Sequence, residues 1–355
     1  MVGPGEKPTR AVRVRPYDEP GLGASEAPCQ TRERCPVRRS RLALLSLTTA
    51  LALGACGGIP PEPSVSGGTP QGGQAQMTEP SPTPTPTPKE LPGGGREFFP
   101  TYRLVGYSGV KGTGPGLGRA GVGNIDDRMQ EILERSKPYA TDGKKIMPVL
   151  EVIATTVQPC RLAPKCRTVS SDEKIQEHLD AIRKVDGVLL LAIQPGRSDF
   201  LTEVKKYEKF LKEPDVGVAL DPEWRMGPDQ EPMRTFGSTD AKELNSVSAY
   251  LDQLIEDNGL PEKIMLYHMI RVNWVRNHDA LEDRKNLAFV LSVDGIGDQQ
   301  LKEGTWKVLM GVKPAFVHPG FKLFYQEDTA QKGWKLMTPE QVLALTPTPD
   351  YVLYE

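Results

Sequence analysis

Apolar and polar positions follow two patterns over residues 96–355. Short runs rich in Val, Ile, Leu and aromatic residues predict β-strands, and longer stretches with apolar residues at helical spacing predict α-helices. The predicted strands are 103–107, 145–154, 187–194, 216–223, 263–269, 287–295, 314–318 and 351–355. The predicted helices are 124–136, 171–185, 198–212, 239–258, 298–310 and 338–345.

Strands that alternate with helices are typical of α/β folds with a parallel sheet. Eight predicted strands within 260 residues favour a (β/α)8 TIM barrel. A doubly wound α/β sheet uses the same strand pattern and is the alternative.

The strand at 216–223 shows how the faces of the sheet are arranged. Gly217, Ala219, Asp221 and Glu223 share one face, and the residues between them form a larger, apolar face. A strand that is apolar on both faces is typical of a parallel strand covered on both sides. We therefore expect the smaller face to line the barrel interior and the larger face to pack under the helices.

Polar and aromatic residues gather where the predicted strands end, which is where TIM barrels build their sites. Asp221, Glu223 and Asp294 are the candidate catalytic residues. The candidate substrate-binding residues are Glu151, Gln194, Trp224, Tyr107, Tyr267, His318 and Glu327. Carboxylates beside aromatic rings suit glycoside cleavage, which needs one acid to protonate the leaving oxygen and a second carboxylate to stabilise or attack the sugar.

The Asp221-Pro222-Glu223 sequence resembles the Asp-x-Glu motif at the end of the fourth strand in family 18 chitinases and family 25 lysozymes. The resemblance implies that Glu223 is the general acid and that Asp221 assists it. The chain departs from the chitinase pattern at Val216 and Ala219, and from the lysozyme pattern after Gly106. A plain polar rim, with Glu223 paired to Arg225, is the alternative interpretation.

A glycine-rich stretch at 116–121 fits the G-x-G-x-x-G pattern of dinucleotide-binding loops. Its first glycine follows the predicted strand by nine residues, whereas that fingerprint sits directly after its strand. We therefore interpret it as a loop over the barrel mouth and expect no cofactor.

The N-terminal 55 residues are organised differently. A basic segment ending at Arg41 precedes an uncharged apolar run of 14 residues, which is the arrangement of a signal peptide. The run ends in Leu53-Gly54-Ala55-Cys56, which resembles the lipobox of bacterial lipoproteins. The resemblance implies that Cys56 is lipid-modified and anchors an extracytoplasmic protein to the bacterial cell membrane.

Residues 56–95 are dominated by Pro, Gly, Thr and Ser and contain no aromatic residue, so they are predicted to be a disordered linker before a domain at 96–355. Residues 1–55 hold nine Lys or Arg and five Asp or Glu, which leaves the rest of the chain with a net charge of −6. That charge argues against a nucleic-acid partner.

Beyond Cys56 only Cys160 and Cys166 remain, and outside the cytoplasm such a pair is predicted to form a disulfide. The four histidines do not form a ligand-spaced set, so no metal is expected. Together these patterns predict a monomeric, surface-anchored lipoprotein that hydrolyses cell-wall or extracellular polysaccharide. A non-catalytic lipoprotein that binds a wall polymer or a partner through the same barrel mouth is the alternative.

Overall fold

The computed structural model describes residues 88–355. The predicted leader at 1–55, Cys56 with its predicted lipid modification, and most of the predicted linker lie outside these residues. The last part of that linker is described: residues 88–95 form turns in which Leu91 is buried and the Tyr102 hydroxyl donates to the Gly94 carbonyl at 2.8 Å. Leu91 and Gly94 therefore contact the residues of the domain.

Eight parallel strands close into a barrel, because β1 pairs with both β2 and β11. The predicted TIM-barrel fold is confirmed, and the doubly wound alternative is excluded by this closure. The barrel strands are β1 Tyr102–Ser108, β2 Lys145–Val157, β4 Val188–Ile193, β5 Val216–Leu220, β7 Lys263–Met269, β9 Leu287–Val293, β10 His318–Leu323 and β11 Tyr351–Tyr354.

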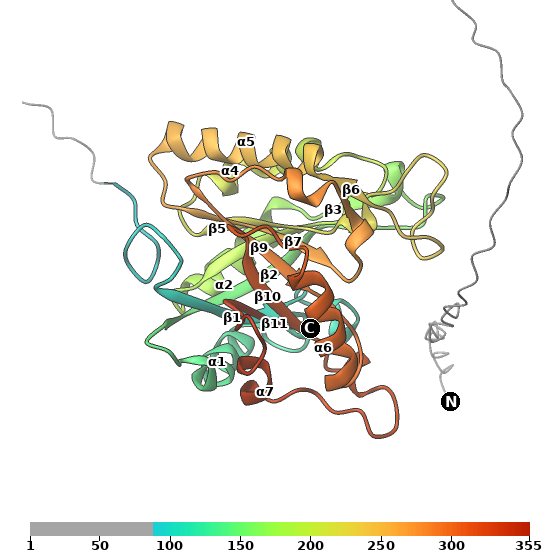
Figure 1. Cartoon of the computed structure of the whole chain (residues 1–355). Coiled ribbons are helices and arrows are strands. Elements are labelled where there is room, and N and C mark those ends of the chain that lie inside the picture. The colour runs from blue at the N-terminus through green and yellow to red at the C-terminus, as the bar shows by residue number, and fades with distance from the viewer. Residues whose placement is uncertain (1–87) are drawn as a thin grey trace, which may run out of the picture. The chain divides into compact units, whose positions relative to one another are not determined.

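The helices lie outside this barrel, with α5 along one side and α1, α6 and α7 toward the opposite side (Figure 1). Side-chain N-caps begin the longer helices, as at Asn124 before α1 and Asp240 before α5. The helices are α1 Ile125–Ser136, α2 Asp172–Arg183, α3 Phe200–Val204, α4 Glu208–Leu211, α5 Ala241–Asn258, α6 Gln299–Met310 and α7 Pro339–Leu343.

Within residues 88–355, three short strands lie outside the barrel. β3 Arg167–Val169 adds to β2 in the antiparallel direction, and β6 Thr239–Asp240 pairs with β8 Val275–Arg276. The predicted helix at 198–212 is broken into α3, a 3-10 turn and α4.

One predicted strand is misplaced. The chain at 314–318 makes a turn, with the Val317 amide donating to the Pro314 carbonyl at 3.1 Å, and β10 only begins at His318. Pro319 and Gly320 made the true strand look like a turn. Pro319 has no amide hydrogen to donate, but its carbonyl accepts a hydrogen bond from the Asp350 amide at 2.8 Å.

Gly106 lets β1 and β2 approach closely. A Cβ atom on Gly106 would lie 1.6 Å from the Val149 carbonyl oxygen of the neighbouring strand. No larger residue fits there without moving β1 or β2, so the spacing of these two strands requires glycine at this position.

Candidate functional site

Charged side chains fill the carboxyl end of the barrel interior. Glu151 comes from β2, His268 from β7 and Lys322 from β10, while Asp221 and Asp294 directly follow β5 and β9. All five are at most 9% exposed. Because buried charges are costly unless they are paired, their contacts decide what this cluster can do.

His268 lies at the centre of this cluster. Its Nδ1 is 2.9 Å from Asp294 Oδ2, and its Nε2 faces Glu151 Oε1 at 3.2 Å and Asp221 Oδ1 at 3.8 Å. Burial opposes the imidazolium charge, but these carboxylates outweigh burial and raise the pKa of His268 well above its usual value. His268 is therefore a cation held between carboxylates.

Lys322 provides the second buried positive charge. Its Nζ lies 3.4 Å from Asp294 Oδ2 and also contacts Glu355, which accepts a hydrogen bond from the Ser108 hydroxyl at 3.0 Å. Burial would lower the pKa of Lys322, but Glu355 and Asp294 raise it well above its usual value. Lys322 thus remains charged inside the barrel.

The two cations hold two carboxylates in their ionised form. Burial alone would raise the pKa of Asp294, but His268, Lys322 and the Ser292 hydroxyl lower it to about 2. Burial also opposes ionisation of Glu151, but His268 outweighs it and lowers the pKa. Tyr351 donates to Glu151 Oε2 at 3.0 Å, which further fixes this carboxylate.

Asp221 and Glu223 have the opposite electrostatic character. Burial raises the pKa of Asp221 to about 6, while His268 and Lys322 limit the rise. Burial raises the pKa of Glu223 to about 8, and the charges of Asp221 and Asp294 add to this effect. Glu223 lies in the 3-10 turn Pro222–Trp224 after β5 and is protonated at neutral pH. It can therefore donate a proton there.

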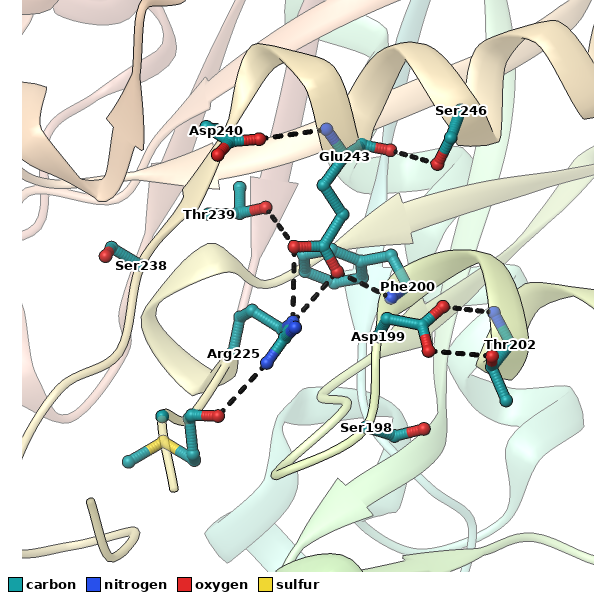
Figure 2. A network of polar contacts seen from close by, with 12 residues as sticks. Ser198, Asp199, Phe200, Thr202, Arg225, Ser238, Thr239, Asp240, Glu243 and Ser246 are labelled. Atoms are coloured by element: carbon teal, nitrogen blue, oxygen red, sulfur yellow. Dashed lines mark hydrogen bonds and ion pairs between the residues drawn. The ribbon is translucent and has the colours of Figure 1, made fainter. Parts of the chain in front are cut away.

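Arg225 does not form the ion pair with Glu223 that the alternative interpretation required. Its Nε donates to Glu243 Oε1 at 2.8 Å, and Figure 2 shows the guanidinium directed toward the first turn of α5. The charges that shift the pKa of Glu223 are therefore those of the barrel cluster.

Three other candidates lie at the carboxyl end of the barrel. Gln194 follows β4 and accepts a hydrogen bond from the Val157 amide at 3.1 Å. Trp224 follows Glu223, and its ring centroid is 5.7 Å from that of Phe236. Glu327 is exposed in the turn after β10.

Tyr107, Tyr267 and His318 do not lie in the cluster. The Tyr107 hydroxyl donates to Glu131 of α1 at 2.7 Å, and the Tyr267 hydroxyl is 2.7 Å from His278 Nε2, so both rings lie under the outer layer. Alternation explains this placement, because Ser108 and His268, their neighbours in the chain, are the inward residues. His318 begins β10 at the opposite end of the barrel, where it binds Asp350 at 2.9 Å.

Four members of the cluster have no role assigned from the sequence. These residues are His268, Lys322, Tyr351 and Glu355. Lys322 was missed because β10 was placed too early. For His268 and Lys322, the available signal was a basic residue at an inward position near the end of an apolar strand.

The glycine-rich stretch at 116–121 packs against the end of β1. A Cβ atom on Gly118 would lie 2.5 Å from the Ser108 carbonyl oxygen. The preceding part of the loop is held by the Lys111 amide, which donates to His178 Nε2 at 3.0 Å. The loop folds into two 3-10 turns before α1, unlike a loop that leads directly into a helix.

Cys160 and Cys166 form the predicted disulfide, with their sulfur atoms 2.00 Å apart. Within residues 88–355, no group of three or more His, Cys, Asp or Glu residues is arranged to hold a metal ion. Among the helices of the described part of the chain, none is both long and apolar enough to cross a membrane.

Neither a scan against models of known protein families nor a search of curated proteins finds a match to this chain. The resemblance to glycoside hydrolases therefore rests on the Asp221-Pro222-Glu223 motif and its surroundings.

Proposed function

We propose that the protein is a surface-anchored lipoprotein whose barrel hydrolyses glycosidic bonds in cell-wall or extracellular polysaccharide, with Glu223 as the general acid. The observation that carries this proposal is the position of Glu223, with its raised pKa, two residues after Asp221 at the carboxyl end of a closed barrel. Glycoside hydrolysis needs one protonated and one ionised carboxyl group, and different environments can produce that difference.

Asp221 is the second carboxyl group of this proposal. Its pKa of about 6 leaves it mostly ionised at neutral pH, when Glu223 still carries its proton. A negative Asp221 would stabilise the positive charge that develops on the sugar ring. Trp224 would offer an aromatic face on which a sugar ring can pack.

The cell-surface location is part of the same proposal. It rests on the signal-peptide pattern and on the lipobox-like sequence ending at Cys56. The Cys160–Cys166 disulfide supports it, because such bonds persist mainly outside the cytoplasm.

Glu223→Gln tests the catalytic proposal, because it keeps the shape of the side chain but removes the proton donor. Loss of a general acid lowers rates by about 10²–10⁴-fold. We expect the variant to release reducing sugar from a panel of wall glycans at a rate reduced by this amount. Glu256→Gln, on the exposed side of α5, is the matched control. Wild-type activity in the Glu223 variant would exclude Glu223 as the acid.

The non-catalytic alternative is favoured by apolar side chains on the loops at the same end of the barrel. Met233, Val272 and Ile296 follow β5, β7 and β9 and are 70%, 39% and 42% exposed. Exposed apolar side chains on neighbouring loops can form a binding surface. This alternative predicts that the protein binds purified cell wall and releases no sugar from any glycan of the panel.

A further inference from the structure

Arg225 is separated from Glu223 by one residue, yet its side chain is bound elsewhere. Its Nε donates to Glu243 Oε1 at 2.8 Å and to Oε2 at 3.2 Å, and its Nη1 donates to the Met226 carbonyl at 3.1 Å (Figure 2). A guanidinium so close in sequence could pair with Glu223. It binds the Glu243 carboxylate instead.

Both oxygens of Glu243 have further partners that fix the carboxylate. Oε1 also accepts from the Phe200 amide at the start of α3, at 2.9 Å, and Oε2 accepts from the Thr239 hydroxyl at 2.8 Å. The Glu243 amide itself donates to the N-cap Asp240 at 3.0 Å. One carboxylate therefore holds the start of α3, the start of α5 and Arg225 together (Figure 2).

The backbone on either side of Arg225 is held independently of this carboxylate. The Gly237 amide donates to the Glu223 carbonyl at 2.6 Å, the Ser238 amide to the Arg225 carbonyl at 3.1 Å, and the Met226 amide to the Gly196 carbonyl at 2.8 Å. Removing the charge of Glu243 would thus leave the guanidinium with its hydrogen bond to the Met226 carbonyl, while this turn stays in place.

The groups that act on Glu223 make it sensitive to such a change. Asp221 and Asp294 oppose its ionisation, and Lys322 and His268 favour it less strongly. Both of these cations are bound to other carboxylates. A guanidinium that turned from Glu243 toward Glu223, two residues away in the chain, would favour the ionised form of Glu223, because a nearby opposite charge stabilises a carboxylate.

We propose that Glu243 is a positioning residue that holds Arg225 away from Glu223 and so keeps Glu223 in its proton-donating form. The importance of Glu243 for catalysis rests on the proposed function. The charge state of the Glu223 carboxyl group can be measured without any substrate.

The experiment is a titration of the Glu223 carboxyl carbon by ¹³C NMR in the full chain, with the Glu223→Gln spectrum as the assignment reference. Glu243→Gln is expected to lower the pKa of Glu223 by about one unit or more. The double variant Glu243→Gln/Arg225→Met is expected to restore the wild-type pKa. Glu256→Gln, elsewhere on α5, is expected to leave it unchanged.

Two results would overturn the proposal. One is a Glu223 pKa that does not fall in Glu243→Gln. The other is a pKa that falls equally in the single and the double variant, because Arg225 would then not be the cause. Should Glu243→Gln fail to fold, Glu243→Asp shortens the carboxylate by one methylene and keeps its charge. In Glu243→Asp we expect a smaller fall in the pKa of Glu223, and adding Arg225→Met should remove that fall. An unchanged Glu223 pKa in Glu243→Asp would also overturn the proposal.

Activity measurements separate this proposal from the proposed function. If Glu223 is the acid, the alkaline limb of the pH–rate profile moves down in Glu243→Gln by the shift seen in the titration. If Glu223→Gln keeps full activity, the proposed function fails while the titration result stands. If Glu223→Gln is inactive and the titration shows no shift, only the role of Glu243 fails.

Discussion

The Nδ1 atom of His268 lies 2.9 Å from Oδ2 of Asp294, and both side chains are almost completely buried inside the barrel. Asp294 is also the carboxylate that His268 shares with Lys322. His268, Asp294 and Lys322 together connect β7, β9 and β10 at the carboxyl end of the barrel, so they bear on both stability and the candidate site.

Asp294→Asn is expected to destabilise the protein by about 3–5 kcal/mol, because it removes the buried carboxylate shared by two buried cations, His268 and Lys322. Urea denaturation monitored by circular dichroism measures the change in the free energy of unfolding. Asp229→Asn, at an exposed position in the loop after β5, is the control and should have little effect. A loss no larger than that of the control would mean that the pair does not stabilise the barrel.

Glu223 makes stability depend on pH in a defined direction. Its pKa is about 8 in the folded protein and near 4.5 when unfolded, so the unfolded chain releases this proton first. The contribution of this group to stability is therefore greatest below pH 4.5, falls as the pH rises and is fully lost by about pH 8. Glutamine does not ionise, so Glu223→Gln does not lose stability in this way as the pH rises.

We therefore expect the stability of Glu223→Gln relative to wild type to increase between pH 5 and pH 8. Denaturation curves for both proteins at several pH values provide the measurement. A difference that stays constant over this range would contradict the raised pKa of Glu223.

Most of the fold could be predicted from the sequence because each barrel strand except β10 is a clear apolar run. Period-two alternation also placed Glu151, Asp221 and Asp294 correctly on the inward face. Strand β10 was the exception, since Pro319 and Gly320 are turn residues in most sequences. Misplacing it by a few residues put His318 at the wrong end of the barrel and hid Lys322.

The charge state of the candidate site was harder to predict. A sequence shows that carboxylates end neighbouring strands, but not which cation reaches which carboxylate. His268 and Lys322 bind Asp294, whereas Arg225 binds Glu243. These choices depend on distances across the barrel between residues far apart in the chain. They make Asp294 strongly acidic and leave Glu223 protonated.

The disulfide closes a small loop, so its effect on stability is expected to be modest. Cys160 and Cys166 are six residues apart, and loop closure on this scale contributes about 2 kcal/mol. Cys160→Ser/Cys166→Ser should therefore remain folded but unfold at a lower urea concentration. Wild-type protein with and without reductant provides a matched comparison, and reductant should not change the unfolding of the double variant.

Two glycine-to-alanine substitutions should have opposite effects on stability. At Gly106 the added Cβ would lie 1.6 Å from the Val149 carbonyl oxygen, so β1 and β2 would have to separate. Overpacking of this kind costs about 1–3 kcal/mol or more. At Gly304, inside α6, the added Cβ meets nothing within 4 Å, and alanine favours the helix by about 1 kcal/mol. Thermal unfolding should show a lower Tm for Gly106→Ala and a higher Tm for Gly304→Ala. A Gly106→Ala variant as stable as wild type would contradict the close contact between β1 and β2.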